Sequence, residues 1–219
     1  MPTVDCILVG HSFVRHLERS LQGKYMADHP SCLERRYAQE LKVDENIRRV
    51  FLVGKSGATV MQPSIPRYLI SRIRPQMILL EYGSNELSRG ERPTLVADKI
   101  FSLAADIGSD FNSVVGILSV VPREGNLKGV NPVQFMASMM TLERLLKEKV
   151  ASMQKIFYHK HQGFYEYQNK SGEKSRLPVS AWSDDAIHPA RPRGMERYKK
   201  SIRAAIFKGL KLVPPPFSK

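Results

Sequence analysis

Short apolar runs alternate with longer amphipathic stretches along the chain. The apolar runs are bounded by Gly, Pro, Asn or Asp, which interrupt regular structure, and the stretches between them repeat apolar residues at helical spacing. This alternation predicts a series of βα units. The expected strands are residues 4–9, 49–53, 77–81, 113–120 and 155–158, and the expected helices are residues 13–21, 66–73, 94–107, 133–153 and 194–208.

The expected strands are apolar throughout, and this pattern favours a sheet that is covered on both faces. Parallel strands joined by helices produce such a sheet, with helices packed on either side. We therefore expect an α/β fold, a three-layer sandwich with a parallel sheet of about five strands. In folds of this kind ligands bind beyond the carboxyl ends of the strands, so candidate functional residues are sought there.

Length and composition fit one soluble globular domain. The chain has 219 residues, of which 42% are hydrophobic and 25% are charged. This composition provides enough apolar material for a core and is too apolar for a disordered chain. A run of three prolines, at positions 214–216, ends the last expected helix. We therefore expect a domain over residues 1–213 and a proline-rich tail, or the start of a linker, over residues 214–219.

Membrane, export and metal signals are missing from the sequence pattern. No run approaches the ~20 apolar residues of a membrane-spanning helix, and residues 1–10 lack the basic leader and long apolar segment of a secretory signal. Cys6 and Cys32 form neither a disulfide framework nor a metal-ligand cluster, and no carboxylate or thiol cluster accompanies the histidines. We expect free thiols, no metal, and an intracellular location that is cytoplasmic or nuclear.

Polar residues stand where the expected strands end. Ser12 follows the first strand, Gly57 the second and Asn85 the third, and Asp185 and His188 precede the last helix. Taken singly, each is ordinary, because serines cap helices and the other residues are common in turns. Since the carboxyl ends of parallel strands meet at one edge of a sheet, we expect all five to lie close together.

Together these residues supply the parts of an acyl-transfer site. A serine hydroxyl is a poor nucleophile until a base removes its proton, and the base must be held in one tautomer. Ser12 would attack, His188 would be the base, and Asp185 would orient the imidazole. The backbone amides of Ser12 and Gly57 and the side-chain amide of Asn85 would stabilise the developing oxyanion.

The order and spacing of these blocks resemble those of the SGNH, or GDSL-like, hydrolases. The resemblance extends from residue 5 to about residue 206 and implies a flavodoxin-like fold. It also implies hydrolysis of small acyl esters, of the esterase, lipase, thioesterase or acetylhydrolase type, without a cofactor. Carried over block by block, it implies a nucleophile at Ser12, oxyanion donors at Gly57 and Asn85, and an acid and a base at Asp185 and His188.

Two positions depart from the family pattern. His11 and Glu86 stand where the family has aspartates, before the serine and after the asparagine. We expect a structural role for His11, although His11 and Trp182 are also candidates for lining a substrate pocket; packing of the loop is the alternative for Trp182. The block Gly-His-Ser-Phe-Val-Arg at residues 10–15 is also similar to esterase domains carried by metazoan retroelements.

Two competing motifs fail on their spacing. Gly54-Lys55-Ser56 could end a phosphate-binding loop, but the glycine required five residues earlier is Arg49. The nucleophile elbow of α/β-hydrolases requires a glycine two residues after the serine, where this chain has Val14.

Positive charge is concentrated near the C-terminus. The formal net charge is +13, and residues 189–219 hold nine basic residues and one acid, a net +8. On the last expected helix Lys199, Lys200 and Arg203 are placed in water, where they could bind a polyanion such as RNA, DNA or an anionic membrane surface. The alternative interpretation of these charges is a solvated face that favours solubility. An alternative function is therefore a weak or inactive SGNH-like module that binds nucleic acid through this surface.

Overall fold

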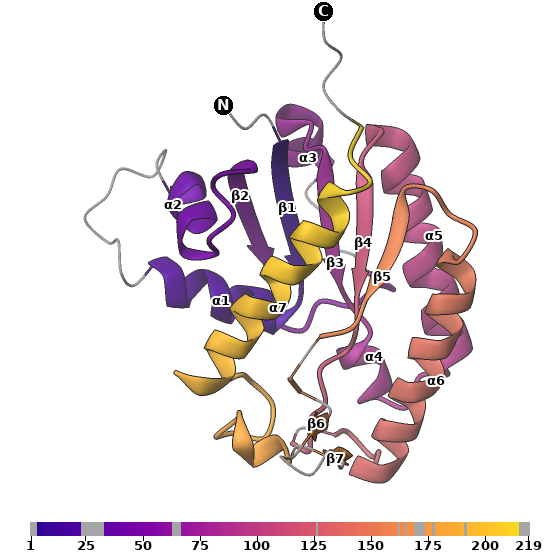
Figure 1. Ribbon diagram of the computed structural model, residues 1–219. Coiled ribbons are helices and arrows are strands. Elements are labelled where there is room, and N and C mark those ends of the chain that lie inside the picture. Colours follow the sequence, from indigo (N-terminus) through magenta and orange to yellow (C-terminus); the bar gives the residue numbers. More distant parts are fainter. Residues whose placement is uncertain are drawn as a thin grey trace, which may run out of the picture.

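The computed structural model describes residues 4–22, 33–62, 67–125, 127–161, 163–164, 166–168, 174–176, 178–190 and 192–214 (Figure 1). The elements, in chain order, are β1 (Val4–Gly10), α1 (Ser12–Gln22), α2 (Leu33–Glu40), β2 (Ile47–Gly54), α3 (Arg67–Ile73), β3 (Met77–Glu81), α4 (Ser84–Leu87), α5 (Pro93–Phe111), β4 (Val114–Leu118), α6 (Pro132–Val150), β5 (Ile156–His159), β6 (Glu166–Gln168), β7 (Lys174–Arg176), the short 3₁₀ helix η2 (Val179–Ala181) and α7 (Arg193–Leu210).

Five parallel strands form the central sheet in the order β2-β1-β3-β4-β5. This is the flavodoxin-like order. After β2 is added on one side of β1, the later strands β3, β4 and β5 are added on the other side, so the strand order reverses between β1 and β3. The expected parallel α/β sheet is confirmed. The strand and helix positions predicted from the sequence lie within a few residues of the observed ones, whereas α4 and the antiparallel pair β6–β7 were not predicted.

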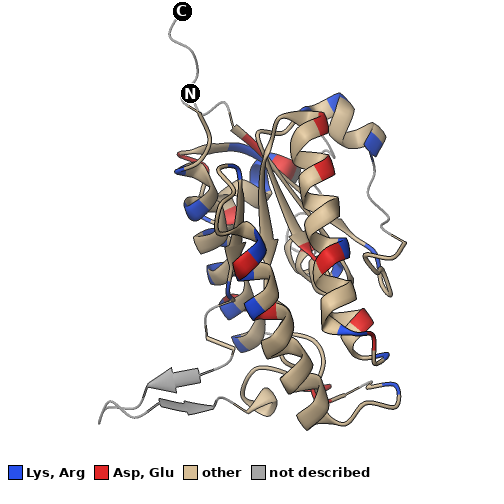
Figure 2. Ribbon diagram, turned by 90° about the vertical axis from the view of Figure 1, so that its right-hand side faces the viewer, with Lys and Arg blue, Asp and Glu red and all other residues tan. Residues whose placement is uncertain are grey.

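Two hydrophobic cores lie on the two faces of the sheet, because successive strand residues point to opposite sides. On β1, Leu8 points into the core formed with α1, α2 and α7, and Ile7 points into the core formed with α5 and α6. Two views at right angles show helices on both faces (Figures 1 and 2). Figure 2 also shows that charged residues occupy the helices and loops far more than the strands.

The cysteines, the C-terminal tail and the helices were each the subject of a prediction from the sequence. Cys6 is a free thiol buried in β1, and its burial raises the pKa of the thiol; Cys32 lies outside the described residues, as do residues 215–219 of the expected tail. Among the described helices, none is both long and apolar enough to cross a membrane.

The start of α7 is packed tightly against the loop before it. Gly194 is the second residue of the helix, and a Cβ added there would lie 2.0 Å from the carbonyl oxygen of Trp182 and 2.8 Å from the Cα of Pro189. A glycine is therefore required where the helix meets this loop, which also carries Asp185 and His188.

We predict that Gly194→Ala lowers the free energy of unfolding by about 1–3 kcal/mol, because the added methyl group must displace backbone atoms. Urea denaturation followed by circular dichroism measures the change. The neighbouring exposed variant Arg193→Ala is the control and should stay within about 0.5 kcal/mol of the wild type. Equal stability of both variants would contradict the close packing.

Candidate active site

The candidate site lies at the carboxyl edge of the sheet, at the point where the strand order reverses. Ser12 begins α1 directly after β1, and Asn85 lies in α4 directly after β3. Because β1 and β3 are hydrogen-bonded neighbours and Gly10 pairs with Glu81, the segments that carry these two residues leave the sheet at the same edge. Asp185 and His188 reach the same edge on the loop between η2 and α7.

A chain of hydrogen bonds connects three of the expected residues. The Nε2 atom of His188 lies 3.0 Å from the Oγ of Ser12, and its Nδ1 atom lies 2.7 Å from Oδ2 of Asp185. A proton on Nδ1 satisfies the carboxylate, which leaves the lone pair of Nε2 to accept the hydrogen of the Ser12 hydroxyl. Residues separated by 176 positions in the chain are thus within hydrogen-bonding distance.

The Asp185 carboxylate is fixed by its own loop. Its Oδ1 atom accepts hydrogen bonds from the backbone N–H groups of His188, at 2.6 Å, and Ile187, at 2.9 Å, and from the hydroxyl of Ser183, at 3.1 Å. Limited burial acts to raise the pKa of Asp185, but the hydrogen bonds from His188 and Ile187 outweigh it and hold this pKa well below its usual range. Asp185 is therefore a permanent carboxylate beside the imidazole.

Two aromatic rings from α1 hold the His188 ring in place. His16 stacks on it with 4.2 Å between ring centroids and 5° between ring planes, and the edge of Phe13 meets it at 5.5 Å. His16 was not among the residues expected at the site. Its spacing was a usable signal, because residues i and i+4 share one face of a helix and His16 is four residues after Ser12.

Two of the expected oxyanion donors, Gly57 and Asn85, meet at one turn. Gly57 has a positive φ of 75°, and a Cβ added there would meet no atom within 4 Å, so its backbone faces open space. The side-chain amide of Asn85 donates a hydrogen bond to the carbonyl oxygen of the next residue, Ala58, at 2.8 Å. An amide nitrogen carries two hydrogens, so one remains for a ligand. The N–H of Ser12, in the first turn of α1, has no acceptor within its own helix.

Glu86 supports this turn from below. The side chain is buried, and it accepts hydrogen bonds from the backbone N–H of Gly83, at 3.2 Å, and from that of Val60. Burial raises the pKa of Glu86, although these backbone N–H groups act to lower it. Glu86 thus connects the segment after β3, which carries Asn85, to the segment after β2, which carries Gly57. The glutamate that replaces the expected aspartate at this position therefore still holds these two segments together.

His11 is part of a buried polar cluster behind Ser12. Its Nδ1 accepts a long hydrogen bond, 3.4 Å, from the backbone N–H of Phe13, and its Nε2 lies 3.8 Å from Oε1 of Glu81. The hydroxyl of Tyr198 donates to the other Glu81 oxygen. Burial raises the pKa of Glu81 to about 8 and lowers that of His11 to about 3. His11 is therefore neutral.

The two candidates for a substrate pocket are both core residues in this structure. The exposed fraction is 2% for His11 and 1% for Trp182, and the Trp182 ring packs edge-on against Phe164 at 5.0 Å. Neither side chain offers surface to an open pocket. This burial fits the packing alternative for Trp182 and the structural role expected for His11.

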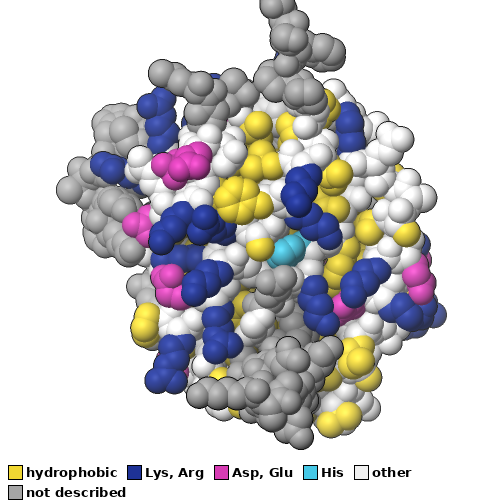
Figure 3. All heavy atoms as spheres, viewed as in Figure 1, with side chains coloured by type: hydrophobic (Ala, Val, Ile, Leu, Met, Phe, Trp, Pro, Cys, Tyr) yellow, Lys and Arg dark blue, Asp and Glu magenta, His cyan; other side chains and the backbone are white. Residues whose placement is uncertain are grey.

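One of the three cations expected on the surface is buried. Lys199 is only 7% exposed, with Nζ 3.0 Å from Glu196 and 4.0 Å from Glu40, so the expectation that it stays in water is wrong. It lies on the same stripe of α7 as Ile202, which faces the core. Lys200 and Arg203 are exposed, and Figure 3 shows Lys and Arg side chains over the face that carries α7.

Within the part of the chain that the structure describes, no group of three or more His, Cys, Asp or Glu residues could hold a metal ion.

Solved structures share this fold. An acylhydrolase assigned in Bacteroides fragilis aligns over 95% of this chain and 90% of its own, with 14% identity and a TM-score of 0.68. A GDSL-like lipase from Bacteroides thetaiotaomicron aligns over 93% and 88%, with 15% identity and a TM-score of 0.62. The esterase EstA from a Pseudoalteromonas species, inhibited by monoethylphosphonate, aligns over 95% and 100%, with 12% identity and a TM-score of 0.57.

No protein-family model and no curated protein sequence matches the chain. The likeness is therefore one of three-dimensional structure, and it extends over nearly the whole of each chain compared. The chain has the fold of the GDSL-like lipases, acylhydrolases and esterases.

We predict that His16→Ala shifts the side-chain NMR signals of His188, because the ring that stacks on it and its ring current are removed. His16→Phe keeps a ring at the same place, so the His188 signals should stay close to their wild-type positions. Histidine-selective ¹³C–¹H spectra of the two variants measure the difference. Identical His188 signals in the wild type and in His16→Ala would contradict the stacking.

Proposed function

We propose that the chain is a serine hydrolase that cleaves acyl esters. The observation that carries the proposal is the hydrogen-bonded series Ser12–His188–Asp185, with 3.0 Å and 2.7 Å between its partners. This is the order of nucleophile, base and orienting acid that acyl transfer requires.

In the first half of the reaction, Oγ of Ser12 bonds to the acyl carbon while its proton passes to Nε2 of His188. The electron pair of the carbonyl double bond moves to the carbonyl oxygen. Asp185 stabilises the imidazolium that forms, because it remains a carboxylate beside Nδ1. The proton of His188 then goes to the leaving alcohol as the carbon–oxygen bond breaks.

In the second half, water attacks the acyl carbon while His188 accepts its proton. That proton then passes to Oγ of Ser12 as the bond between the acyl carbon and Oγ breaks. The products are a carboxylic acid and the free serine. In both halves the negative oxygen would be bound by the N–H groups of Ser12 and Gly57 and by the free amide hydrogen of Asn85. The acyl hydrolases with the same fold support this assignment, as does the phosphonate inhibition of one of them.

We predict that a fluorophosphonate probe labels the wild type once, at Ser12, and does not label Ser12→Ala. Hydrolysis of p-nitrophenyl acetate should fall in that variant by a factor on the order of 10³ or more, because the variant lacks the hydroxyl that is hydrogen-bonded to Nε2 of His188. Mass spectrometry of the labelled peptide and steady-state kinetics measure the two effects.

The matched control is Ser71→Ala, which removes an exposed serine on α3, just before the start of β3 and so toward the edge of the sheet opposite the site. It should be labelled and active like the wild type. Labelling of Ser12→Ala at a second residue, or loss of wild-type activity on adding a chelator, would contradict the assignment.

We predict that Asn85→Ala lowers kcat by a factor on the order of 100–1,000 with little change in KM, because its amide acts on charge that develops only in the transition state. Thermal unfolding shows whether loss of the bond to Ala58 has disturbed the turn. A rise in KM at constant kcat would instead make Asn85 a substrate-binding residue.

Binding of nucleic acid or an anionic membrane remains a second proposal with less support. The ion pairs of Lys199 remove one of the three cations on which it rested. The two exposed cations, Lys200 and Arg203, still give this face a positive charge, and binding through it would weaken with salt.

A further inference from the structure

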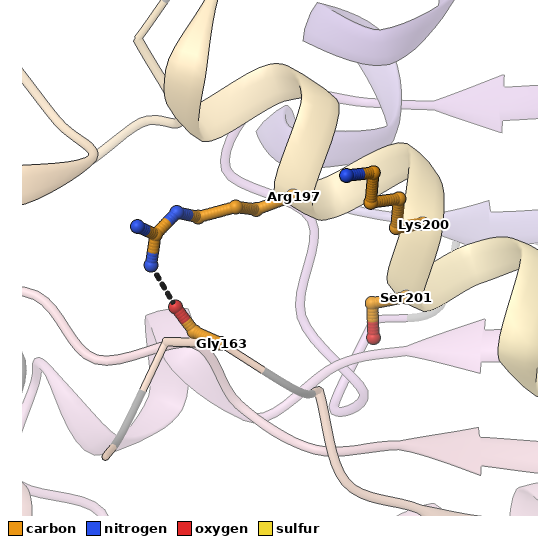
Figure 4. Close-up of a pocket in the computed structure, with 4 residues that line it drawn as sticks. All are labelled: Gly163, Arg197, Lys200 and Ser201. Atoms are coloured by element: carbon orange, nitrogen blue, oxygen red, sulfur yellow. Dashed lines mark hydrogen bonds between the residues drawn. The ribbon is translucent and has the colours of Figure 1, made fainter. Parts of the chain in front are cut away.

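We propose that a pocket beside α7, separate from the candidate active site, binds the phosphate group of a small phosphorylated molecule. The pocket has a volume of about 230 Å³ and is lined, among the described residues, by Gly163, Arg197, Lys200 and Ser201 (Figure 4). It lies between the middle of α7 and the segment after β5. The lining includes none of the residues to which the ester hydrolysis is assigned.

Two cations stand at this pocket without an acid. Arg197 and Lys200 are one helical turn apart, and among the ion pairs of the described residues neither has a carboxylate partner. Neighbouring Lys199, by contrast, is paired with Glu196 and Glu40. Like charges three residues apart on a helix repel each other, and an anion bound between them would relieve this repulsion.

Arg197 is already positioned for an anion. Its Nη1 donates to the carbonyl oxygen of Gly163 at 2.6 Å, as Figure 4 shows, which fixes the guanidinium group across the pocket and leaves its other N–H groups available. A planar guanidinium matches two oxygens of a phosphate group, whereas an ammonium such as that of Lys200 acts as a point charge.

Gly163 keeps this space open. Its φ is +80°, and a Cβ added there would come within 3.9 Å of Nη1 of Arg197. A side chain at this position would thus be strained and would project toward the guanidinium group. The glycine lets the backbone carbonyl, rather than a side chain, face Arg197.

The wall formed by Ser201 is buried and held in place. The Oγ of Ser201 lies 2.9 Å from Nδ1 of His161 and 3.2 Å from Nε2 of His159. Burial lowers the pKa of His161 to about 3 and that of His159 to about 4, so both rings are neutral. Among the described residues that line the pocket, the positive charge therefore comes from Arg197 and Lys200, and two cations suit a phosphate dianion.

The test is isothermal titration calorimetry on the full chain at low salt, with inorganic phosphate and with glycerol 3-phosphate as separate ligands. In Arg197→Gln/Lys200→Gln we expect binding of both ligands to weaken by about tenfold or more, because two charge-assisted contacts are lost. Tighter binding of glycerol 3-phosphate by the wild type would mean that the organic part is also recognised; equal binding would mean that free phosphate is sufficient.

The matched control is Arg72→Gln/Lys99→Gln, which removes the same two residue types from exposed positions on α3 and α5. It should bind phosphate within about twofold of the wild type, since screened charges far from the ligand contribute little. Circular dichroism checks that both variants fold.

Any one of three results would overturn the proposal. One is the absence of phosphate binding by the wild type. Another is equal weakening in the two double variants, which would make the binding a property of the overall positive charge. A single-stranded oligonucleotide that binds while both small phosphates fail would likewise replace the pocket with an extended cationic surface.

Discussion

Strand β1 is hydrogen-bonded to β2 on one side and to β3 on the other, and the position of the candidate site depends on this central placement. The strand is buried on both faces, so it cannot shift its register by one residue without exchanging the two cores. Ser12 follows it directly and is therefore fixed to the most constrained part of the sheet. In the proposed reaction, a side chain anchored in this way loses little further freedom when it reacts.

Buried carboxylates provide much of the support around this edge. Glu86 connects two backbone segments through hydrogen bonds from Gly83 and Val60. Glu81, at the end of β3, accepts a hydrogen bond from the Tyr198 hydroxyl of α7, but its Oε1 has no hydrogen-bond partner among the described residues. A buried polar atom without a partner costs about 1–3 kcal/mol. This cost, and the raised pKa of Glu81, identify the cluster behind Ser12 as a place where packing and polar interactions compete.

Helix α7 serves different purposes on its two sides. Its inner stripe, with Tyr198 and Ile202, closes one hydrophobic core and helps to hold the loop of His188, which packs against the helix start at Gly194. Its outer side carries Arg197 and Lys200 at the pocket. Because the inner stripe is anchored, the outer cations are presented on a rigid element, as a binding site for an anion requires.

The sequence by itself determined the layers of the fold and where the chemistry would be. Apolar runs and helical spacing are local properties, and the strand ends of a parallel sheet meet at one edge in any such fold, so Ser12, Asn85 and His188 could be placed together in advance. The position of His16 at the site and the burial of Lys199 could also have been predicted. His16 lies at helical spacing from Ser12, and Lys199 lies at helical spacing from Ile202.

Only the tertiary structure decided how the polar groups pair across long separations. Three interactions join segments that are distant in sequence. They are the ion pair of Lys199 with Glu40, the hydrogen bond from Val60 to Glu86, and the hydrogen bond from Arg197 to Gly163. Burial of His11 and Trp182 depends in the same way on what packs over them. Hydrogen bonds and ion pairs act over a few ångströms, and no local pattern records which distant segments the folded chain brings within that distance.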